Sequence, residues 1–226
     1  MSRTAIAVVG HVEWVDFAVV DSLPQPGEIL HAREHFQEPG GGGAVAAVQA
    51  RRLAGSALFL TALGNDHLGA RSREELERHG VEVHAATRER PQRRAFTYLD
   101  ERAERTITVL GERIVPHGDD ALPWDRLADA DAVYFTGGDP DALRKARRAR
   151  VLVATPRAAE TLRTAGVELD VLVASASDPG ERVEEGIQAR HVVLTEGSAG
   201  GRWTGADEEG RWAAATPPGP PVDAYG

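Results

Sequence analysis

Short apolar runs alternate with amphipathic segments over the second half of the chain, and this alternation constrains the fold more than any other feature. Apolar stretches begin near residues 132, 151, 170 and 191, and segments with helical periodicity lie between them, over 140–149, 157–166 and 180–189. Apolar strands separated by helices are typical of βαβ units, in which parallel strands form a sheet covered by helices on both faces. The sequence therefore predicts a three-layer α/β domain with a mainly parallel central sheet.

The first half contains similar elements but interrupts them with exposed strands. Residues 5–10 and 57–64 have the composition of buried strands, and 44–54 and 68–79 that of helices. Residues 14–38 and 93–110 instead alternate apolar with polar side chains, which is typical of strands with one face in water. We expect these strands to form a small β lid, over about 12–38 and 92–110, inserted into a single domain that covers residues 1–226.

The composition excludes several classes of site. The 226 residues carry a formal net charge of −9 and include no cysteine. A net negative charge argues against a broad nucleic-acid-binding surface, which needs clustered Lys and Arg. Without cysteine, the chain has no disulfide, thiolate metal site or Cys nucleophile. No apolar run approaches the roughly 18 residues of a membrane-spanning helix. We expect a soluble, cytoplasmic protein with no nucleic-acid or membrane partner.

Four consecutive glycines, residues 40–43, directly precede the helix predicted from residue 44. Glycine lets the backbone approach a ligand closely, and a helix start offers free N–H groups to anions. A flexible turn into the helix accounts for the run equally well. Gly41, Gly43 and Ala46 also satisfy a loose G-x-G-x-x-A dinucleotide pattern, with Asp66 after the next strand, although no buried strand leads into it.

Two further motifs carry weaker signals. The segment TEGSAGG, residues 195–201, ends a predicted buried strand and enters a loop that suits either a bound phosphate or a plain turn. His31 and His35 lie on a predicted strand, where side chains four residues apart are too distant to bind one metal ion together. We therefore expect no dedicated metal cage.

Taken in order, five segments resemble the ribokinase-like (PfkB-type) family of carbohydrate and nucleoside kinases. They are VVGHVEWVDF (8–17), PQPGEILHA (24–32), GGGAVAAVQARRLAG with LGNDHLG (41–55 and 63–69), TEGSAGG (195–201) and PPVDAYG (220–226). The resemblance implies a kinase that phosphorylates a hydroxyl of a sugar or related small molecule, with ATP and Mg²⁺ as cofactors.

The resemblance also implies which residues bind the two substrates. One acidic contact to the sugar falls on Glu13 or Asp16, because the spacing after Gly10 is one residue longer than in the commonest family pattern. The other expected contacts to the sugar are Gly41, Gly42 and Ala46. Those to the nucleotide are Thr195, Gly197, Gly200 and Gly226, and Asp178 is expected to approach the metal through water.

Several positions depart from the family pattern. Ala46 stands where an Asn is usual, Ser175 and Asp178 replace the Asn and Glu of an N-x-x-E motif, and Arg157 alone remains of a D-x-N-x-R motif. These departures favour one alternative, a non-catalytic protein on the same fold that binds a small molecule or nucleotide. A dinucleotide-dependent oxidoreductase that uses Gly41 and Gly43 is the third hypothesis.

In the family, the glycine that corresponds to Gly226 is followed by A-G-D, whose amides form an anion hole and whose Asp accepts the hydroxyl proton. The given sequence ends at Gly226, so we assign no catalytic residue within it. We expect negligible kinase activity from this chain and a natural product that continues beyond it. The exposed lid strands also predict a homodimer formed through the lid.

Overall fold

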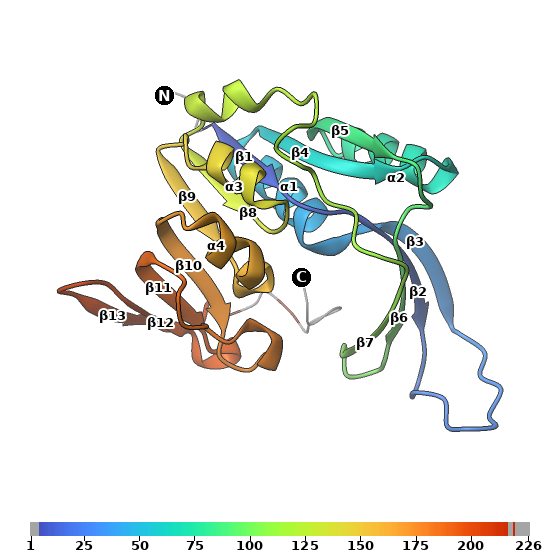
Figure 1. Ribbon diagram of the computed structural model, residues 1–226. Coiled ribbons are helices and arrows are strands. Elements are labelled where there is room, and N and C mark those ends of the chain that lie inside the picture. Colours follow the sequence, from blue (N-terminus) through green and yellow to red (C-terminus); the bar gives the residue numbers. More distant parts are fainter. Residues whose placement is uncertain (1–4, 217–218, 220–226) are drawn as a thin grey trace.

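The computed structural model describes residues 5–216 and 219. These residues form a nine-stranded sheet, a four-stranded sheet and four α-helices (Figure 1). Within this part of the chain, no helix is both long enough and apolar enough to cross a membrane.

The large sheet has the strand order β13-β12-β11-β10-β9-β8-β1-β4-β5. Every pairing from β11 to β5 is parallel, and β12 and β13 add an antiparallel edge. The strands are β1 (Ile6–Val9), β4 (Ala57–Gly64), β5 (Glu82–Arg88), β8 (Ala132–Phe135), β9 (Val151–Ala154), β10 (Leu169–Ser175), β11 (Ala189–Thr195), β12 (Gly201–Thr204) and β13 (Glu209–Trp212). The predicted mainly parallel central sheet is confirmed.

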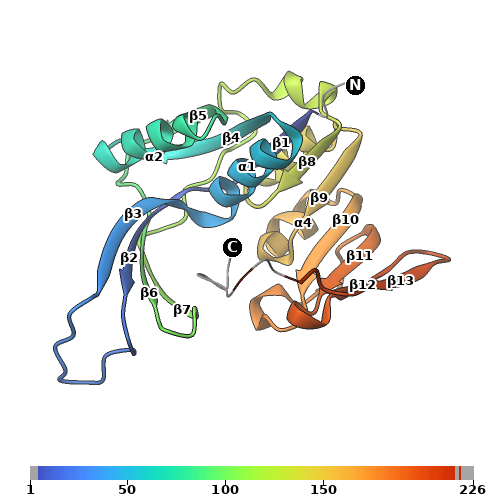
Figure 2. The same cartoon turned by 180° about the vertical axis from the view of Figure 1, so that it is seen from behind.

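Helices cover both faces of the large sheet, because neighbouring side chains on a strand point in opposite directions. Val8 and Phe59 pack in a buried cluster with residues of α1 and α2. Val9 and Leu60 pack in a second cluster with residues of α3, α4 and a 3₁₀ helix, η1 (Trp124–Asp129). The four α-helices are α1 (Gly41–Ala54), α2 (His67–Arg78), α3 (Pro140–Ala146) and α4 (Ala159–Ala165), and the result is the expected three layers (Figures 1 and 2).

The small sheet has the order β3-β2-β6-β7 and is separate from the large one. Strand β2 runs parallel to β6 and antiparallel to β3, and β6 and β7 form the predicted hairpin. Only residues 10–12 separate β1 from β2, so the small sheet extends from the carboxyl end of β1 (Figure 1). Its strands are β2 (Glu13–Val19), β3 (Glu34–Gly40), β6 (Arg94–Leu99) and β7 (Arg105–Leu110).

Two predicted elements differ in the structure. Within the segment 14–38, which we expect to form exposed strands, the second strand begins only at Glu34 and continues to Gly40, so it includes the first glycine of the run. The helix expected over 180–189 is wrong. A single 3₁₀ turn, η3 (Pro179–Glu181), is followed by irregular backbone, and Gly186 adopts a φ of +84° that an α-helix cannot contain.

The start of α1 lies directly on the carboxyl end of β1. The Gly43 N–H donates to the His11 carbonyl at 3.2 Å. A Cβ added at Gly43 would lie 2.7 Å from that carbonyl oxygen, and one at Gly10 would lie 2.9 Å from the Gly43 Cα. Both distances are shorter than real Cβ contacts, so this close approach of helix and strand requires glycine at both positions.

Candidate active site

A cavity of about 490 Å³ opens where β1 and β8 end, bordered by the start of α1 and by strand β7 of the small sheet. In open parallel sheets, ligands bind in the crevice beyond the carboxyl ends of the strands. The polar side chains that line this cavity come from segments far apart in sequence, and they include His11, Glu13, Arg93, Arg113, Thr136 and Arg157. This cavity is the candidate active site.

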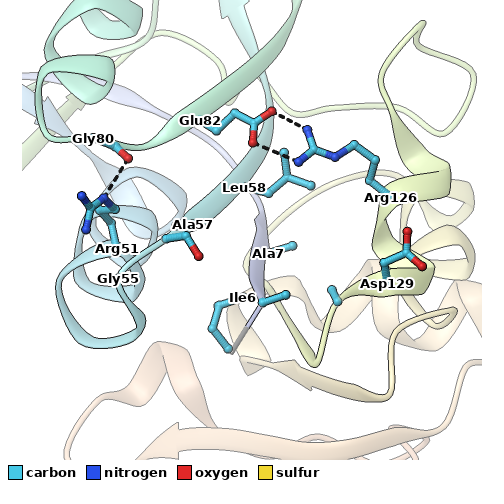
Figure 3. A pocket seen from close by; sticks show the side chains of 13 residues that line it. Ile6, Ala7, Arg51, Gly55, Ala57, Leu58, Gly80, Glu82, Arg126 and Asp129 are labelled. Carbon is cyan, nitrogen blue, oxygen red and sulfur yellow. Dashed lines mark hydrogen bonds and ion pairs between the residues drawn. The ribbon is translucent and has the colours of Figure 1, made fainter. Parts of the chain in front are cut away.

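A second cavity, of about 520 Å³, lies at the opposite, amino ends of β1 and β4 (Figure 3). Its wall consists largely of small apolar side chains and backbone. The two arginines that Figure 3 shows at its rim already have partners: Arg126 pairs with Glu82 at 2.9 Å, and Arg51 donates to the Gly80 carbonyl at 3.0 Å. Apart from these two arginines, Glu82 and the Asp129 carboxylate, the lining offers few polar side chains to a ligand, so this cavity is the weaker candidate.

The glycine run places the open start of α1 at the candidate active site. The N-cap residue, Gly40, has no side chain that could accept from the first N–H groups, and the first turn contains no acidic residue. Gly41 has a φ of +83°, and Gly41 and Gly42 both border the cavity. Ala46 does not border it; it is half-buried and packs against the core beneath α1. The helix start therefore offers backbone donors to an anion or a hydroxyl.

His11 follows β1 and is 7% exposed. Burial, together with the nearby positive charges of Arg113 and Arg93, lowers the pKa of His11 from 6.5 to about 3. Its Nε2 lies 3.7 Å from a Glu13 carboxylate oxygen, and its Nδ1 has no hydrogen-bond partner among the described residues. A neutral imidazole of this kind can both donate to and accept from a substrate hydroxyl.

Between the two acidic candidates, the structure places Glu13 at the cavity and Asp16 on the opposite face of β2. The Glu13 carboxylate pairs with Arg93 Nε at 3.0 Å. Asp16 accepts hydrogen bonds from Gln37 and Arg94 on neighbouring strands. Burial acts to raise the pKa of Asp16, but these hydrogen bonds and the charge of Arg94 outweigh it and hold the pKa below its usual value. Asp16 therefore joins strands of the small sheet rather than bordering the cavity.

The loop after β10 forms another wall of the cavity. Arg157 pairs with Asp178 and, at 3.5 Å, with Glu181. Glu181 also accepts a hydrogen bond from the Ser175 N–H at 2.9 Å, whereas Asp178 accepts from the Gly180 N–H at 2.8 Å. Only Arg157 and Glu181 of this group border the cavity. The acidic residue that the loop presents there is thus Glu181, which the sequence comparison with N-x-x-E did not identify.

The expected nucleotide residues lie in a different place, beyond β11. Thr195 pairs with Ser175 across the sheet, so it belongs to the same carboxyl edge, and its hydroxyl lies 3.4 Å from the Ala174 carbonyl. Gly197 and Gly200 bound a 3₁₀ turn with φ values of +58° and +93°. None of them borders the candidate active site. Gly226 lies outside the described residues.

Sequence reasoning missed several residues that border the cavity. Thr136 and Thr155 each follow the carboxyl end of a parallel strand, a position that could have indicated them. Tyr134 is mostly buried, and burial and the charge of Glu181 raise its pKa. Arg93 and Arg113 flank the β6–β7 hairpin, and no local pattern marks them.

The described residues contain no group of three or more His, Asp or Glu side chains placed to hold a metal ion. The Asp178 and Glu181 carboxylates both pair with Arg157. Magnesium commonly binds through one or two carboxylates together with substrate phosphates.

Comparison with known proteins relates this geometry to one family. The sequence model described as "pfkB family carbohydrate kinase" matches residues 3–178. An ATP-dependent ribose-1-phosphate kinase from Halopiger xanaduensis is 29% identical over 134 residues, which cover 58% of this chain and 45% of that protein. The match therefore spans less than half the length of this relative.

Solved structures share the fold across nearly the whole chain. Ribokinase from Thermotoga maritima matches with a TM-score of 0.73 and 19% identity, over 95% of this chain and 79% of that one. Adenosine kinase from Sinorhizobium meliloti matches with a TM-score of 0.73 and 15% identity, over 95% and 81% of the two chains. At these identities, the likeness shows the fold alone.

Proposed function

We propose that this chain, which belongs to the pfkB family of carbohydrate kinases, is part of an ATP-dependent kinase that phosphorylates a hydroxyl of a sugar or related small molecule. One observation supports this most directly. Glu13, the neutral His11 and the open start of α1 border a single cavity at the carboxyl edge of the sheet, beneath the small sheet. Carboxylate, imidazole and backbone N–H groups together suit a polyhydroxylated ligand.

In this proposal, the sugar lies between α1 and the small sheet, and ATP lies along the strand ends toward Thr195, Gly197 and Gly200. Phosphoryl transfer depends mainly on positioning and on stabilisation of charge. Glu13 and His11 orient the sugar hydroxyls, and the Gly41 and Gly42 backbone donates to its oxygens.

Magnesium would enter bound to the ATP phosphates, whose charge it neutralises. Asp178 would approach it only through water, because its carboxylate already accepts hydrogen bonds from Arg157 and from the Gly180 N–H.

The acceptor hydroxyl must also lose a proton. The low pKa of His11, about 3, makes it a weak base, and the Glu13 carboxylate is paired with Arg93. A general base works best with a pKa near the operating pH. We therefore assign proton removal to the aspartate that the family resemblance predicts beyond Gly226.

The test uses the natural gene product at its full length, with Mg-ATP and a panel of sugars and nucleosides. We expect sugar-dependent release of ADP. Glu13→Gln should raise KM roughly tenfold or more through loss of a charged hydrogen bond, and Asp16→Asn should leave KM near the parent value. Saturable sugar binding with no phosphoryl transfer would instead support a non-catalytic binding protein, which the residues at Ala46, Ser175 and Asp178 favour.

The geometry supports a dinucleotide-dependent oxidoreductase less well. The strand before the glycines, β3, belongs to the small sheet and pairs antiparallel with β2, so it is not the buried parallel strand of a dinucleotide-binding unit. Asp66 caps α2 by accepting from the Gly69 N–H at 2.9 Å. Saturable NADH binding without ATP binding would favour this third function.

We also propose a cytoplasmic homodimer formed through the small sheet. Strand β7 is at the edge of that sheet and exposes Ile107, Val109 and Leu110. An exposed apolar edge strand readily pairs with another chain. Sedimentation should give the mass of two chains, and Leu110→Lys should shift it toward one; a monomeric parent at working concentration would contradict the dimer.

A further inference from the structure

We infer that the molecule bound in the candidate active site carries an anionic group, a phosphate or a carboxylate, which Arg113 and Arg93 hold. The inference rests on the proposed function, because it identifies the class of acceptor that the kinase would phosphorylate. The ligand would be a sugar phosphate or sugar acid rather than a neutral sugar. The evidence for this inference is the set of charged side chains that border the cavity, together with polar groups there that have no hydrogen-bond partner among the described residues.

Three arginines and two glutamates border the cavity. Arg157 pairs with Glu181 and with Asp178, and Arg93 pairs with Glu13. Arg113 has no hydrogen bond or ion pair within the described part of the chain, although the negative charge of Glu13 attracts its guanidinium at longer range. One guanidinium, with five N–H donors, is therefore available to a ligand.

The surroundings of Arg113 are predominantly positive. The pKa of Arg113 is lowered, mainly by loss of hydration and next by repulsion from Arg93. Attraction by Glu13 raises the pKa, and this effect is smaller than that of Arg93 but larger than the repulsion by Arg157. The charges of Arg113 and Arg93 likewise help to lower the pKa of His11. An anion placed between these guanidinium groups would offset the repulsion and form charge-assisted hydrogen bonds with them.

Neighbouring polar groups extend the site toward the rest of a sugar. His11 and Thr136 are 7% and 3% exposed, and within the part of the chain that the structure describes the His11 Nδ1 and Thr136 Oγ1 atoms have no hydrogen-bond partner. Both side chains lie beside Gly42 at the uncapped start of α1: a Cβ added there would be 3.6 Å from His11 Cε1 and 3.5 Å from Thr136 Cβ. Buried polar atoms are nearly always paired, so a ligand with several oxygens would complete this wall.

The ATP phosphates are the other source of an anion, and the arrangement favours the acceptor. Arg113 shares its cavity with Glu13 and with Ile107 and Val109 of the small sheet. The described residues expected to bind the nucleotide lie at the end of β11 and just after it, and β8, β9 and β10 separate β11 from β1 in the large sheet. The unpaired arginine therefore lies on the side of the cavity that the sugar would occupy.

The test measures binding by calorimetry on the 226-residue chain without nucleotide. The probes are ribose 5-phosphate, glucose 6-phosphate, fructose 1-phosphate and gluconate, each compared with its neutral parent sugar. We expect at least one anionic probe to bind about tenfold or more tightly than its parent, as charged hydrogen bonds provide. Arg113→Met should abolish that preference. Arg102→Met, at the exposed turn of the same hairpin, should retain it.

Equal affinity for every anionic probe and its parent would overturn the inference, as would an unchanged preference in Arg113→Met. Weaker ATP binding in Arg113→Met, with the sugar preference intact, would assign the arginine to the nucleotide and also overturn it. Because Arg113 makes no hydrogen bond or ion pair with any other described residue, we expect Arg113→Met to unfold at the same temperature as the parent. Phosphoryl transfer to neutral sugars alone would sink this inference but keep the kinase. Tighter binding of anionic probes without any phosphoryl transfer would support this inference and contradict the proposed kinase activity.

Discussion

At the scale of single residues, two neighbouring glycines at the start of α1 have different roles. Gly43 is in direct contact with the backbone of Gly10 and His11, whereas Gly42 borders the cavity and has space around it. The same residue type thus allows close helix–strand packing at Gly43 and borders the cavity at Gly42.

Gly43→Ala should destabilise the protein, because its methyl group would lie 2.7 Å from the His11 carbonyl oxygen and 2.8 Å from the Gly10 carbonyl carbon. Overpacking of this kind typically costs about 1–3 kcal/mol, and urea unfolding would measure it. Gly42→Ala is the matched control, since its methyl group would meet nothing closer than 3.5 Å. It should fold normally and lose ligand affinity; equal stabilities of the two variants would contradict this account of α1.

His11 should make stability depend on pH. An unfolded histidine takes up a proton near pH 6.5, whereas folded His11 does so only near pH 3. The contribution of neutral His11 to the free energy of unfolding is therefore present above pH 6.5 and is lost as the pH falls toward 3. The loss approaches about 1.4 kcal/mol per pH unit within that window. Urea unfolding from pH 7 to pH 4.5 should show a shallower decline for His11→Gln than for the parent. The exposed His79→Gln should follow the parent, and parallel curves for parent and His11→Gln would rule the effect out.

At the scale of elements, the two helices of one layer begin differently. Helix α1 begins without a side-chain cap at the cavity, whereas Asp66 caps α2 and also accepts from the Gln92 N–H at 3.0 Å. In the first turn of α1 the Gly43 N–H donates to the His11 carbonyl but no side chain caps the helix, whereas in α2 the Asp66 carboxylate accepts from the Gly69 N–H. A sequence pattern locates both helix starts but does not show which of them stays open.

Asp66→Ala should lower the free energy of unfolding by about 1 kcal/mol or more, the usual effect of losing an N-cap, with a further loss from the Gln92 contact. Asp66→Asn should recover part of it, because an amide oxygen can still cap. Thermal unfolding would compare both with Asp129→Ala at an exposed position. If Asp66→Ala unfolds like the parent, the carboxylate is free for another role.

At the scale of the whole molecule, one buried side chain joins the two sheets. Gln92 is 2% exposed; its Oε1 accepts from the Gly64 N–H at 2.9 Å, and its Nε2 donates to the Val12 carbonyl at 2.7 Å. Gly64 ends β4 of the large sheet, and Val12 immediately precedes β2 of the small sheet. Gln92 thus helps to set the small sheet over the cavity.

Gln92→Ala would leave a buried N–H and a buried carbonyl unpaired, each at a cost of about 1–3 kcal/mol. We expect lower stability in urea unfolding and faster hydrogen exchange in the strands of the small sheet than in β4 or β8. Gln49→Ala, on the exposed face of α1, is the control. Uniform loss of protection across both sheets would show that Gln92 does not act specifically at their junction.

The local sequence determined the layered α/β fold, the small separate sheet and a helix after the glycine run, because hydrophobic periodicity and glycine content act over a few residues. The helix begins at Gly41 rather than at the predicted residue 44, so three of the glycines belong to it. The helix predicted from sequence over 180–189 does not form, because Pro179, Gly180 and Gly186 interrupt a polar segment that has few apolar side chains to bury.

Only the tertiary structure decided which residues meet at the cavity. Side chains alternate between the two faces of β2, so Glu13 at its start borders the cavity and Asp16, three residues later, lies on the far face. Arg93, Arg113 and Glu181 come together from separate loops, and no short-range pattern records that meeting. Periodicity specifies which elements form, whereas the position of the small sheet relative to the large one selects the side chains that border the cavity.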